Sequence, residues 1–303
     1  MVPAVTGILV IGGGQLARSL QERAAGRKLQ RLGRPDIDFD DLSGLRTALH
    51  SAAPELVVNA AAYTAVDRAE TDAEAARRAN RDGPAALAAY CAQAGIPLIH
   101  VSTDYVFDGL KGAPYVETDP TNPSGVYGAT KLEGEQAVLA ACSRAIVLRT
   151  SWVYAATGRN FVLTMLNAAT KTSTLRVVAD QIGCPTAAPD LADAILGIAD
   201  RIGARGWNDS YAGLFHAAGS GATSWHGLAE ATFEAAARHG VARPRIDPIA
   251  TADWPTPVRR PPDSRLDCDK LARVFALRLP AWQATLSRVV DDVFATRRQP
   301  VPA

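Results

Sequence analysis

Tyr127 and Lys131 are spaced so that a helix would bring both side chains to the same face. A free tyrosine has a pKa of ~10 and therefore exchanges its proton poorly at neutral pH. An ammonium ~4 Å from the phenol, at an effective dielectric constant of ~20, contributes roughly 4 kcal/mol, which equals about three pKa units. We therefore predict a proton-transfer pair in which Lys131 lowers the pKa of Tyr127. Thr103, in the preceding Ser102-Thr103-Asp104, can supply a second hydroxyl to the same substrate oxygen.

The same spacing also occurs on solvated helix faces, so the elements around the pair decide between the two interpretations. Short apolar runs alternate with segments of helical periodicity, which predicts a parallel sheet covered on both faces. We expect an α/β fold with a Rossmann-type doubly wound parallel sheet and a small C-terminal lobe. The expected strands are residues 6–11, 28–32, 56–59, 98–102 and 145–150, and the expected helices are 15–25, 45–51, 72–93, 127–141 and 225–238.

A glycine-rich turn follows the first expected strand. Gly12, Gly13 and Gly14 separate that strand from a helix, in a unit as long as a nucleotide-binding βαβ. Glycine permits a tight turn and lets a phosphate approach the N–H groups at the helix N-terminus. The third glycine of the motif is replaced by Ala17, which is acceptable because this residue need only be small. The turn is typical of a dinucleotide site, and an ordinary strand-to-helix turn is the alternative.

The end of the second expected strand bears on the choice of cofactor. An NAD site usually has an acidic residue there, which binds the ribose 2′-hydroxyl. This chain has Gly33 and Arg34 instead, and an arginine can make a bidentate contact with a 2′-phosphate. We therefore predict NADPH in preference to NADH, and NADH stays open. Asp36 and Asp38 follow closely, and either can reach a ribose or the adenine.

Composition excludes several classes of function. The 32 basic and 31 acidic residues nearly cancel, and no run of like charge favours a nucleic-acid or membrane-surface partner. No apolar stretch approaches the ~18 residues of a spanning helix, and Met1 is not followed by a signal-peptide pattern. Cys91, Cys142, Cys184 and Cys268 are scattered, and the five histidines show no ligand spacing, so neither zinc nor a disulfide framework is expected. We expect a cytoplasmic protein.

Further motifs occur over nearly the whole chain. They are NAAAYTAVD at residues 59–67, STDYVF at 102–107, YGATK at 127–131, RTSWVY at 149–154, DQIGCPT at 180–186, and RP at 260–261 with SRL at 264–266. In order and spacing the set resembles the extended short-chain dehydrogenase/reductases and, within them, the dTDP-4-dehydrorhamnose reductase family. The resemblance implies NADPH-dependent reduction of the 4-keto group of dTDP-6-deoxy-L-lyxo-4-hexulose to give dTDP-L-rhamnose.

The resemblance also implies a role for each residue of the site. Tyr127 would donate a proton to the carbonyl oxygen, Lys131 would hold the nicotinamide ribose, and Thr103 would hydrogen-bond the substrate oxygen. Because a ketone gains negative charge as hydride arrives, two hydroxyl donors stabilise the transition state more than the ground state. Asp104 would lie beside the sugar, and the flat indole of Trp152 suits an apolar sugar face. Trp152 as a core residue and Asp104 as a cap are the alternatives.

The full set of expected site residues follows from the motifs and the resemblance together. The pyrophosphate is expected at the glycine turn, the adenine beside Asp38 and Phe39, and the nicotinamide ribose beside Ala62 and Thr64. The expected cofactor-binding residues are Gly12, Gly14, Gln15, Leu16, Gly33, Arg34, Asp38, Phe39, Ala60, Ala61, Ala62, Thr64, Val101, Tyr127 and Lys131, and the expected substrate-binding residues are Thr103, Asp104, Tyr127, Trp152 and Arg260.

The two parts of the chain are expected to divide these tasks. Residues 1–150 are predicted to form the NADP-binding Rossmann domain. After about Ser151 prolines become frequent, so residues 151–303 are predicted to form mainly a substrate-binding lobe, with some segments returning to the sheet.

One departure from the family concerns a metal. Some members form dimers through a magnesium site built from three glutamates, and the matching positions here are Ser19, Pro189 and Asp292. Two of these cannot offer a carboxylate, whereas magnesium requires hard oxygen ligands. We therefore expect no metal, and either a monomer or a homodimer without a bridging metal.

Two other functions stay open at this point. One is a 4-ketoreductase for another dTDP-deoxysugar of a natural-product pathway. The other is a non-catalytic NADP-binding regulatory subunit, which would have no use for a proton donor such as Tyr127. The sequence does not determine the nucleotide sugar, the C4 stereochemistry or the oligomeric state.

Overall fold

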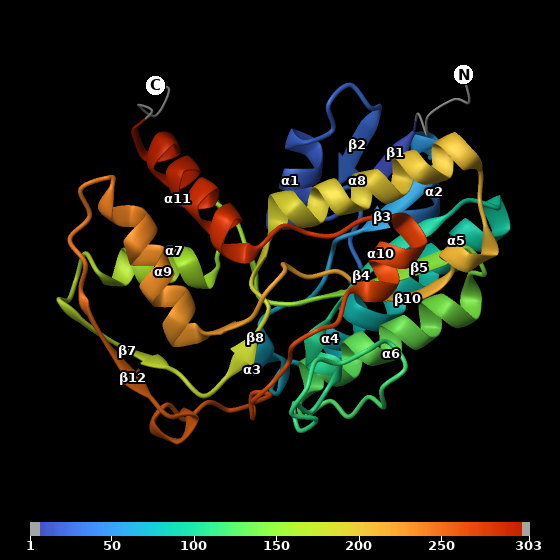
Figure 1. The fold of residues 1–303 in the computed structure, drawn as a ribbon. Coiled ribbons are helices and arrows are strands. Elements are labelled where there is room, and N and C mark those ends of the chain that lie inside the picture. The colour runs from blue at the N-terminus through green and yellow to red at the C-terminus, as the bar shows by residue number, and fades with distance from the viewer. Residues whose placement is uncertain (1–6, 299–303) are drawn as a thin grey trace.

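A six-stranded, fully parallel sheet forms the centre of the computed structural model, which describes residues 7–298 (Figure 1). The strand order is β10-β5-β4-β3-β1-β2. The expected fold class is therefore confirmed. The strands are β1 (Ile8–Ile11), β2 (Leu29–Leu32), β3 (Leu56–Asn59), β4 (Leu98–Thr103), β5 (Ala145–Thr150) and β10 (Gly213–His216).

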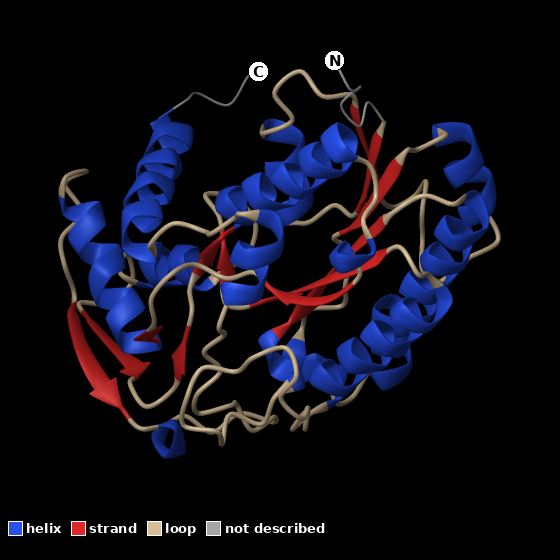
Figure 2. Ribbon diagram, turned by 45° about the vertical axis from the view of Figure 1, so that its right-hand side comes forward, coloured by secondary structure: helices blue, strands red, loops and turns tan. Residues whose placement is uncertain are grey.

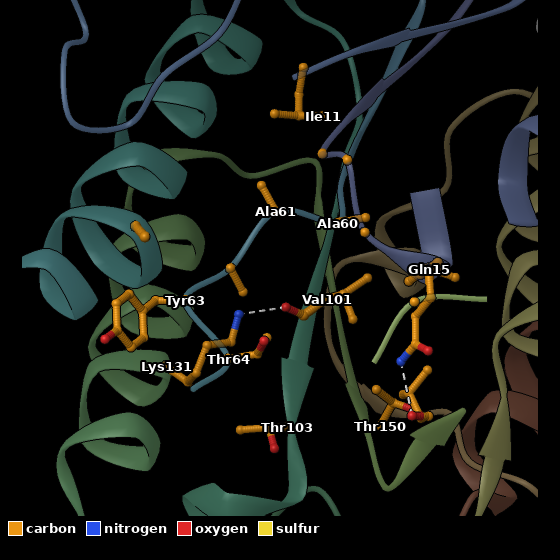
Figure 3. A pocket seen from close by; sticks show the side chains of 18 of the residues that line it. Ile11, Gln15, Ala60, Ala61, Tyr63, Thr64, Val101, Thr103, Lys131 and Thr150 are labelled. Atoms are coloured by element: carbon orange, nitrogen blue, oxygen red, sulfur yellow. Dashed lines mark hydrogen bonds between the residues drawn. The ribbon is translucent and has the colours of Figure 1, made fainter. Parts of the chain in front are cut away.

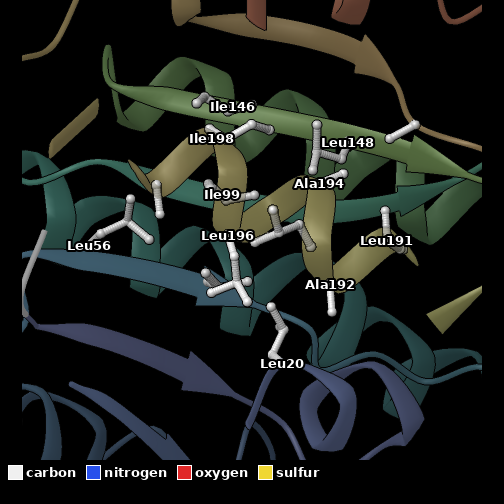
Figure 4. Close-up of a cluster of buried hydrophobic side chains, with 14 of the residues drawn as sticks. Leu20, Leu56, Ile99, Ile146, Leu148, Leu191, Ala192, Ala194, Leu196 and Ile198 are labelled. Atoms are coloured by element: carbon white, nitrogen blue, oxygen red, sulfur yellow. The ribbon is translucent and has the colours of Figure 1, made fainter. Parts of the chain in front are cut away.

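Helices cover both faces of this sheet because central strands such as β1, β3 and β5 are buried on both sides (Figure 2). In β1, Ile8 and Val10 belong to one buried cluster, and Leu9 and Ile11 belong to the opposite one. The first cluster packs against α1 and α8, whose apolar side chains lie across the strands in Figure 4. The covering helices are α1 (Gln15–Glu22), α8 (Ala188–Arg205) and α10 (Asp269–Phe275) on that face, and α2 (Leu45–Ala52), α5 (Gly83–Ala94) and α6 (Val126–Ala141) on the other.

A smaller lobe with its own apolar core lies beside the sheet (Figure 1). Its main elements are β7 (Thr174–Val178), β12 (Arg245–Ile249), α7 (Phe161–Ala168), α9 (Trp225–Ala237) and α11 (Trp282–Arg298). Short elements complete the chain: α3 (Val66–Ala69), α4 (Ala73–Arg77), η1 (Arg78–Asp82), η2 (Asp104–Val106), β6 (Val153–Tyr154), β8 (Ile182–Gly183), β9 (Thr186–Ala187), η3 (Asp209–Tyr211), β11 (Thr223–Ser224) and η4 (Thr251–Asp253).

Several element boundaries differ from those expected. The helix at 72–93 is interrupted by η1, a π-helical turn between α4 and α5. The first helix ends at Glu22 instead of residue 25, and Ala25 and Gly26 follow with φ of 45° and 82°. Thr6, the expected start of the first strand, lies outside the described residues. Some segments after residue 150 were expected to return to the sheet, and β10 and α8 are the elements that lie in the sheet layer. Within residues 7–298, no helix combines the length and apolarity that crossing a membrane requires.

Helix α6 packs closely against the π-helical turn η1 at Gly134. A methyl group at Gly134 would lie 1.9 Å from the carbonyl oxygen of Asn80. In an ordinary helix Gly→Ala stabilises by about 1 kcal/mol, but here we expect Gly134→Ala to destabilise by about 3 kcal/mol because α6 must move. Urea unfolding measures this change. Gly44→Ala is the control, because no atom lies within 4 Å of the added methyl there, and wild-type stability in Gly134→Ala would contradict the prediction.

Candidate active site

A cavity of about 950 Å³ opens at the carboxyl ends of the strands, where β1 lies between β2 and β3. The chain crosses the sheet in opposite directions on the two sides of β1, and ligands of open α/β sheets bind at such a switch point. Figure 3 shows the side chains that converge there. The expected site residues that line this cavity are Gly12, Gly14, Gln15, Leu16, Gly33, Arg34, Phe39, Ala60, Ala61, Ala62, Thr64, Val101, Thr103, Asp104, Tyr127, Lys131 and Trp152.

The glycine turn leaves an open cradle at the N-terminus of α1. Gly12 has a φ of 137°, and a side chain there would meet the Ala60 backbone at 3.1 Å. Nothing lies within 4 Å of a Cβ placed at Gly13 or Gly14, and Gly14 caps α1 without a side-chain hydrogen bond. The first N–H groups of α1 therefore face the cavity without a side-chain cap. This arrangement fits the pyrophosphate of a dinucleotide.

Tyr127, Lys131 and Thr103 meet at the inner end of the cavity. Tyr127 is in the first turn of α6, Lys131 is one turn further, and Thr103 ends β4. Lys131 is only 1% exposed, and its Nζ donates a hydrogen bond to the carbonyl oxygen of Val101 at 2.7 Å (Figure 3). The packing of α6 against β4 thus points a phenol, an ammonium and a hydroxyl into one space.

The expected lowering of the Tyr127 pKa by Lys131 is wrong for this structure. Burial raises the pKa of Tyr127 to about 12, and a hydrogen bond with Thr103 only partly offsets this rise. The Lys131 ammonium is bound to a strand carbonyl. Burial likewise lowers the pKa of Lys131 to about 8, against the opposing effect of Glu135. A phenol that stays protonated at neutral pH is suited to donate its proton to a developing alkoxide.

Asp104 is a buried carboxyl held by hydroxyl groups. Thr103 Oγ1 donates to Oδ1 at 3.1 Å and Ser151 Oγ donates to Oδ2 at 2.9 Å. Burial raises the pKa of Asp104 to about 6, while hydrogen bonds from Ser264, Ser151 and Thr103 lower it. The residue that caps η2 is Thr103, whose Oγ1 accepts from the Tyr105 N–H at 3.2 Å. Asp104 therefore lines the cavity as a carboxyl bound by hydroxyl groups and does not cap η2 with its side chain.

Trp152 forms part of an aromatic wall that the sequence revealed only in part. Its indole stacks on Trp225 with ring centroids 3.4 Å apart and an interplanar angle of 5°, and both line the cavity. A Cβ at Gly183 would lie 2.4 Å from Cε2 of Trp152, so glycine is required there. Trp152 has a φ of 47°, which is unusual for a bulky residue. Trp225 was expected only as the first residue of a helix. It does begin α9, where the Gly227 N–H donates a hydrogen bond to Ser224 Oγ.

Asp38 and Arg260 are the expected site residues that do not line the cavity. Arg34 Nε donates to Asp38 Oδ1 at 2.8 Å, which engages the carboxylate in an ion pair. Arg34 is also paired with Asp40. Arg260 Nη2 donates to Asp67 Oδ1 at 2.7 Å and the guanidinium lies 5.9 Å from the Tyr105 ring centroid. Both side chains thus form ion pairs and are not part of the cavity wall.

Other lining residues were not among the expected site residues. Arg18, Arg31 and Arg159 bring cationic groups to the cavity from α1, β2 and the loop before α7. Only tertiary contact brings these three segments together, so no local pattern could have identified the arginines. Ser102 and Tyr105 also line the cavity, and their place in the STDYVF motif beside Thr103 and Asp104 is the signal that could have identified them.

The expected absence of a metal concerns positions away from this cavity. In residues 7–298 no three His, Cys, Asp or Glu side chains are grouped as they would be to hold a metal ion. Ser19 is buried in α1, and Asp292 is near Arg23, which forms an ion pair with Asp193.

Comparisons with known proteins agree with this geometry. A family model described as the RmlD substrate binding domain matches residues 6–295. A dTDP-4-dehydrorhamnose reductase of Sinorhizobium fredii is 46% identical over 278 residues, covering 91% of this chain and 94% of that protein. A probable dTDP-4,6-dihydroxy-2-methyloxan-3-one 4-ketoreductase of Streptomyces antibioticus is 39% identical, covering 98% and 97%. The crystal structure of a Bacillus anthracis dTDP-4-dehydrorhamnose reductase in complex with NADP is similar with a TM-score of 0.85 and 29% identity, covering 94% and 98%.

Proposed function

The chain belongs to the family of the RmlD substrate binding domain, that of the dTDP-4-dehydrorhamnose reductases, and we propose that it shares their reaction. It uses NADPH to reduce the 4-keto group of dTDP-6-deoxy-L-lyxo-4-hexulose, which gives dTDP-L-rhamnose. The observation that carries this proposal is the convergence of Tyr127, Lys131 and Thr103 beside an uncapped glycine turn in one cavity.

The proposed roles follow from position and charge. The N–H groups at the start of α1 bind the pyrophosphate, and Lys131 binds the nicotinamide ribose. NADPH, when bound, supplies the hydride. Thr103 and Tyr127 direct their hydroxyl groups at the substrate oxygen, and Tyr127 gives it a proton. Asp104 and Trp152 contact the sugar, with one face of the Trp152 indole covered by Trp225.

We propose that two parts of the chain divide the binding of the cofactor and of the substrate. Residues 1–150 bind the cofactor and the later residues supply mainly the substrate side, although β10 and α8 pack in the sheet layer. A cytoplasmic location and a monomer or metal-free homodimer remain our proposals for this protein.

The test is NADPH oxidation with the 4-keto sugar, generated from dTDP-4-keto-6-deoxyglucose by a 3,5-epimerase. We expect keto-sugar-dependent loss of absorbance at about 340 nm and a product that NMR identifies as dTDP-L-rhamnose. No turnover with tight NADPH binding would favour a regulatory NADP-binding subunit. The 4-ketoreductase from Streptomyces antibioticus, 39% identical, gives a second candidate activity on a related keto sugar. A different C4 epimer in the product spectrum would favour that candidate.

Arg34 is proposed to contact the 2′-phosphate of NADPH. Its guanidinium lines the cavity and also forms ion pairs with Asp38 and Asp40. We expect Arg34→Ala to weaken NADPH binding about tenfold and to leave NADH binding within about twofold, because hydrogen bonds between charged groups contribute about 1.5–3 kcal/mol. Fluorescence titration with both cofactors measures this. Arg78→Ala is the matched control, since Arg78 pairs with the same Asp40 without lining the cavity. Equal weakening of both cofactors by Arg34→Ala would contradict the assignment.

A further inference from the structure

A buried ion pair lies directly behind the proposed catalytic lysine. Glu135 and Arg149 have side chains that are each 2% exposed. Arg149 Nε donates to Glu135 Oε1 at 2.9 Å and Nη2 donates to Oε2 at 2.6 Å. Ser102 Oγ donates to the same Oε1 at 2.5 Å. The carboxylate therefore accepts hydrogen bonds on both oxygens, from two neighbouring strands.

The sheet register explains why these groups meet. Ser102 of β4 and Arg149 of β5 are paired residues in adjacent parallel strands, so their side chains point to the same face. That face is covered by α6, where Glu135 lies one turn after Lys131. Residues four apart on a helix are neighbours, so the carboxylate and the ammonium lie on one side of α6. Ser102 itself lines the cavity.

A contribution to the stability of the fold does not by itself account for this buried ion pair. Burying two charges costs more free energy than a salt bridge usually returns, and apolar replacements are often equally stable. Moreover, Arg149 Nη1 is buried without a hydrogen-bond partner among the described residues. The Glu135–Arg149 pair therefore points to a function other than packing.

We propose that Glu135 is a positioning residue of the active site, and that its carboxylate, held by Arg149 and Ser102, keeps the ammonium of Lys131 charged where it is bound to the Val101 carbonyl. The inference depends on the proposed function only for the role of Lys131. The charge coupling can be measured without substrate or cofactor, so the two proposals can fail separately.

The other titratable groups around Lys131 do not supply this charge. His100 of β4 is fully buried, and burial and Lys131 keep its pKa well below the usual value, so it is neutral. Tyr127 of α6 is a protonated phenol, and Asp104 of η2 is not among the charges that shift the pKa of Lys131. No charged residue of α3, α4, η1 or α5 is buried in the part of the chain that the structure describes. Glu135 is thus the buried carboxylate that raises the pKa of Lys131 against the effect of burial.

The experiment is an NMR titration of protein labelled with [13Cε]-lysine. The chain has five lysines, and the Lys131 signal is identified by its absence in Lys131→Met. In the wild type we expect a midpoint near pH 8. In Glu135→Gln the midpoint should fall by about one pH unit or more, because loss of a nearby negative charge disfavours the charged amine.

Glu133→Gln is the matched control. Glu133 lies on the same helix and pairs with Arg77 at 3.1 Å, but both side chains are 36% exposed. Its removal should leave the Lys131 midpoint within about 0.3 pH units, because solvent screens exposed charges. A purely structural role for Glu135 would lower the melting temperature and leave the Lys131 midpoint unchanged. An unchanged midpoint in folded Glu135→Gln overturns the proposal.

If Glu135→Gln does not fold, the double variant Glu135→Gln/Arg149→Met replaces it, since Arg149 is then not left buried without its carboxylate partner. Its Lys131 midpoint should again lie below that of the wild type, and an equal midpoint overturns the proposal. With an active enzyme, the alkaline limb of kcat/KM should move to lower pH by the same amount. A wild type without reductase activity would reject the proposed function and leave the NMR result as the test of the coupling.

Discussion

Replacement of Tyr127 by phenylalanine should lower kcat at least about 100-fold, because a positioned general acid typically contributes about 10²–10⁴-fold. The ring and its edge-to-face contact with Tyr105, at 5.7 Å between centroids, should remain. The affinity for NADPH should therefore change less than about threefold, since only a hydroxyl at the substrate end is lost. Steady-state kinetics with the keto sugar and fluorescence titration with NADPH measure the two quantities.

Tyr154→Phe is the matched control for this variant. Tyr154 is also buried, and its hydroxyl donates to the Trp282 carbonyl oxygen at 3.2 Å in the smaller lobe. Loss of that bond should cost about 1 kcal/mol of stability and leave kcat unchanged. Turnover in Tyr127→Phe equal to that of the wild type would remove Tyr127 from the mechanism.

Replacement of Lys131 by methionine should weaken both cofactor binding and turnover. Methionine keeps the apolar stem but loses the ammonium, so we expect at least a tenfold loss of NADPH affinity, which is about 1.4 kcal/mol. Turnover should fall further, about 100-fold or more, because the positive charge that stabilises developing negative charge near Tyr127 is also lost. The alkaline limb near pH 8, which the lowered pKa of Lys131 predicts, should disappear from the pH profile.

Lys270→Met provides the control for this variant. Lys270 is partly buried, its Nζ donates to the Leu214 carbonyl oxygen at 2.6 Å, and burial lowers its pKa as well. It differs from Lys131 in lying away from the cavity. We expect Lys270→Met to lose stability and to retain NADPH affinity and turnover. Equal functional losses in the two variants would assign both effects to instability.

Much of the fold could be predicted because its signals are local. A parallel strand covered on both faces reads as a short apolar run, and a glycine cluster marks the turn where β1 meets α1. The expected strands at residues 56–59 and 145–150 therefore match β3 and β5. The family assignment was equally accessible, since the motifs from NAAAYTAVD to SRL are contiguous strings in a fixed order.

The unexpected elements depend on contacts between distant parts of the chain. The strand β10 adds to the sheet edge from more than 60 residues beyond β5, where it pairs from Gly213↔Ile146 to His216↔Arg149. The π-helical turn η1 directly precedes Gly83 and Pro84, and Pro84 has no N–H to donate to the Asn80 carbonyl as a continuous α-helix would require. That carbonyl oxygen lies against Gly134 of α6. The strand β10, in contrast, has no pattern of its own in the sequence.

For the chemistry of the site, too, some features could be predicted from the sequence and others required the tertiary structure. Residue types and spacing were sufficient to single out Tyr127, Lys131 and Thr103, because helix periodicity and strand ends determine which side chains share a direction. Their protonation required the tertiary structure, because a pKa depends on burial and on charges brought close by folding. Sequence spacing alone suggested that Lys131 would lower the pKa of Tyr127, whereas desolvation raises it to about 12. The buried pair of Glu135 and Arg149, which we propose keeps Lys131 charged, likewise exists only where β4, β5 and α6 meet.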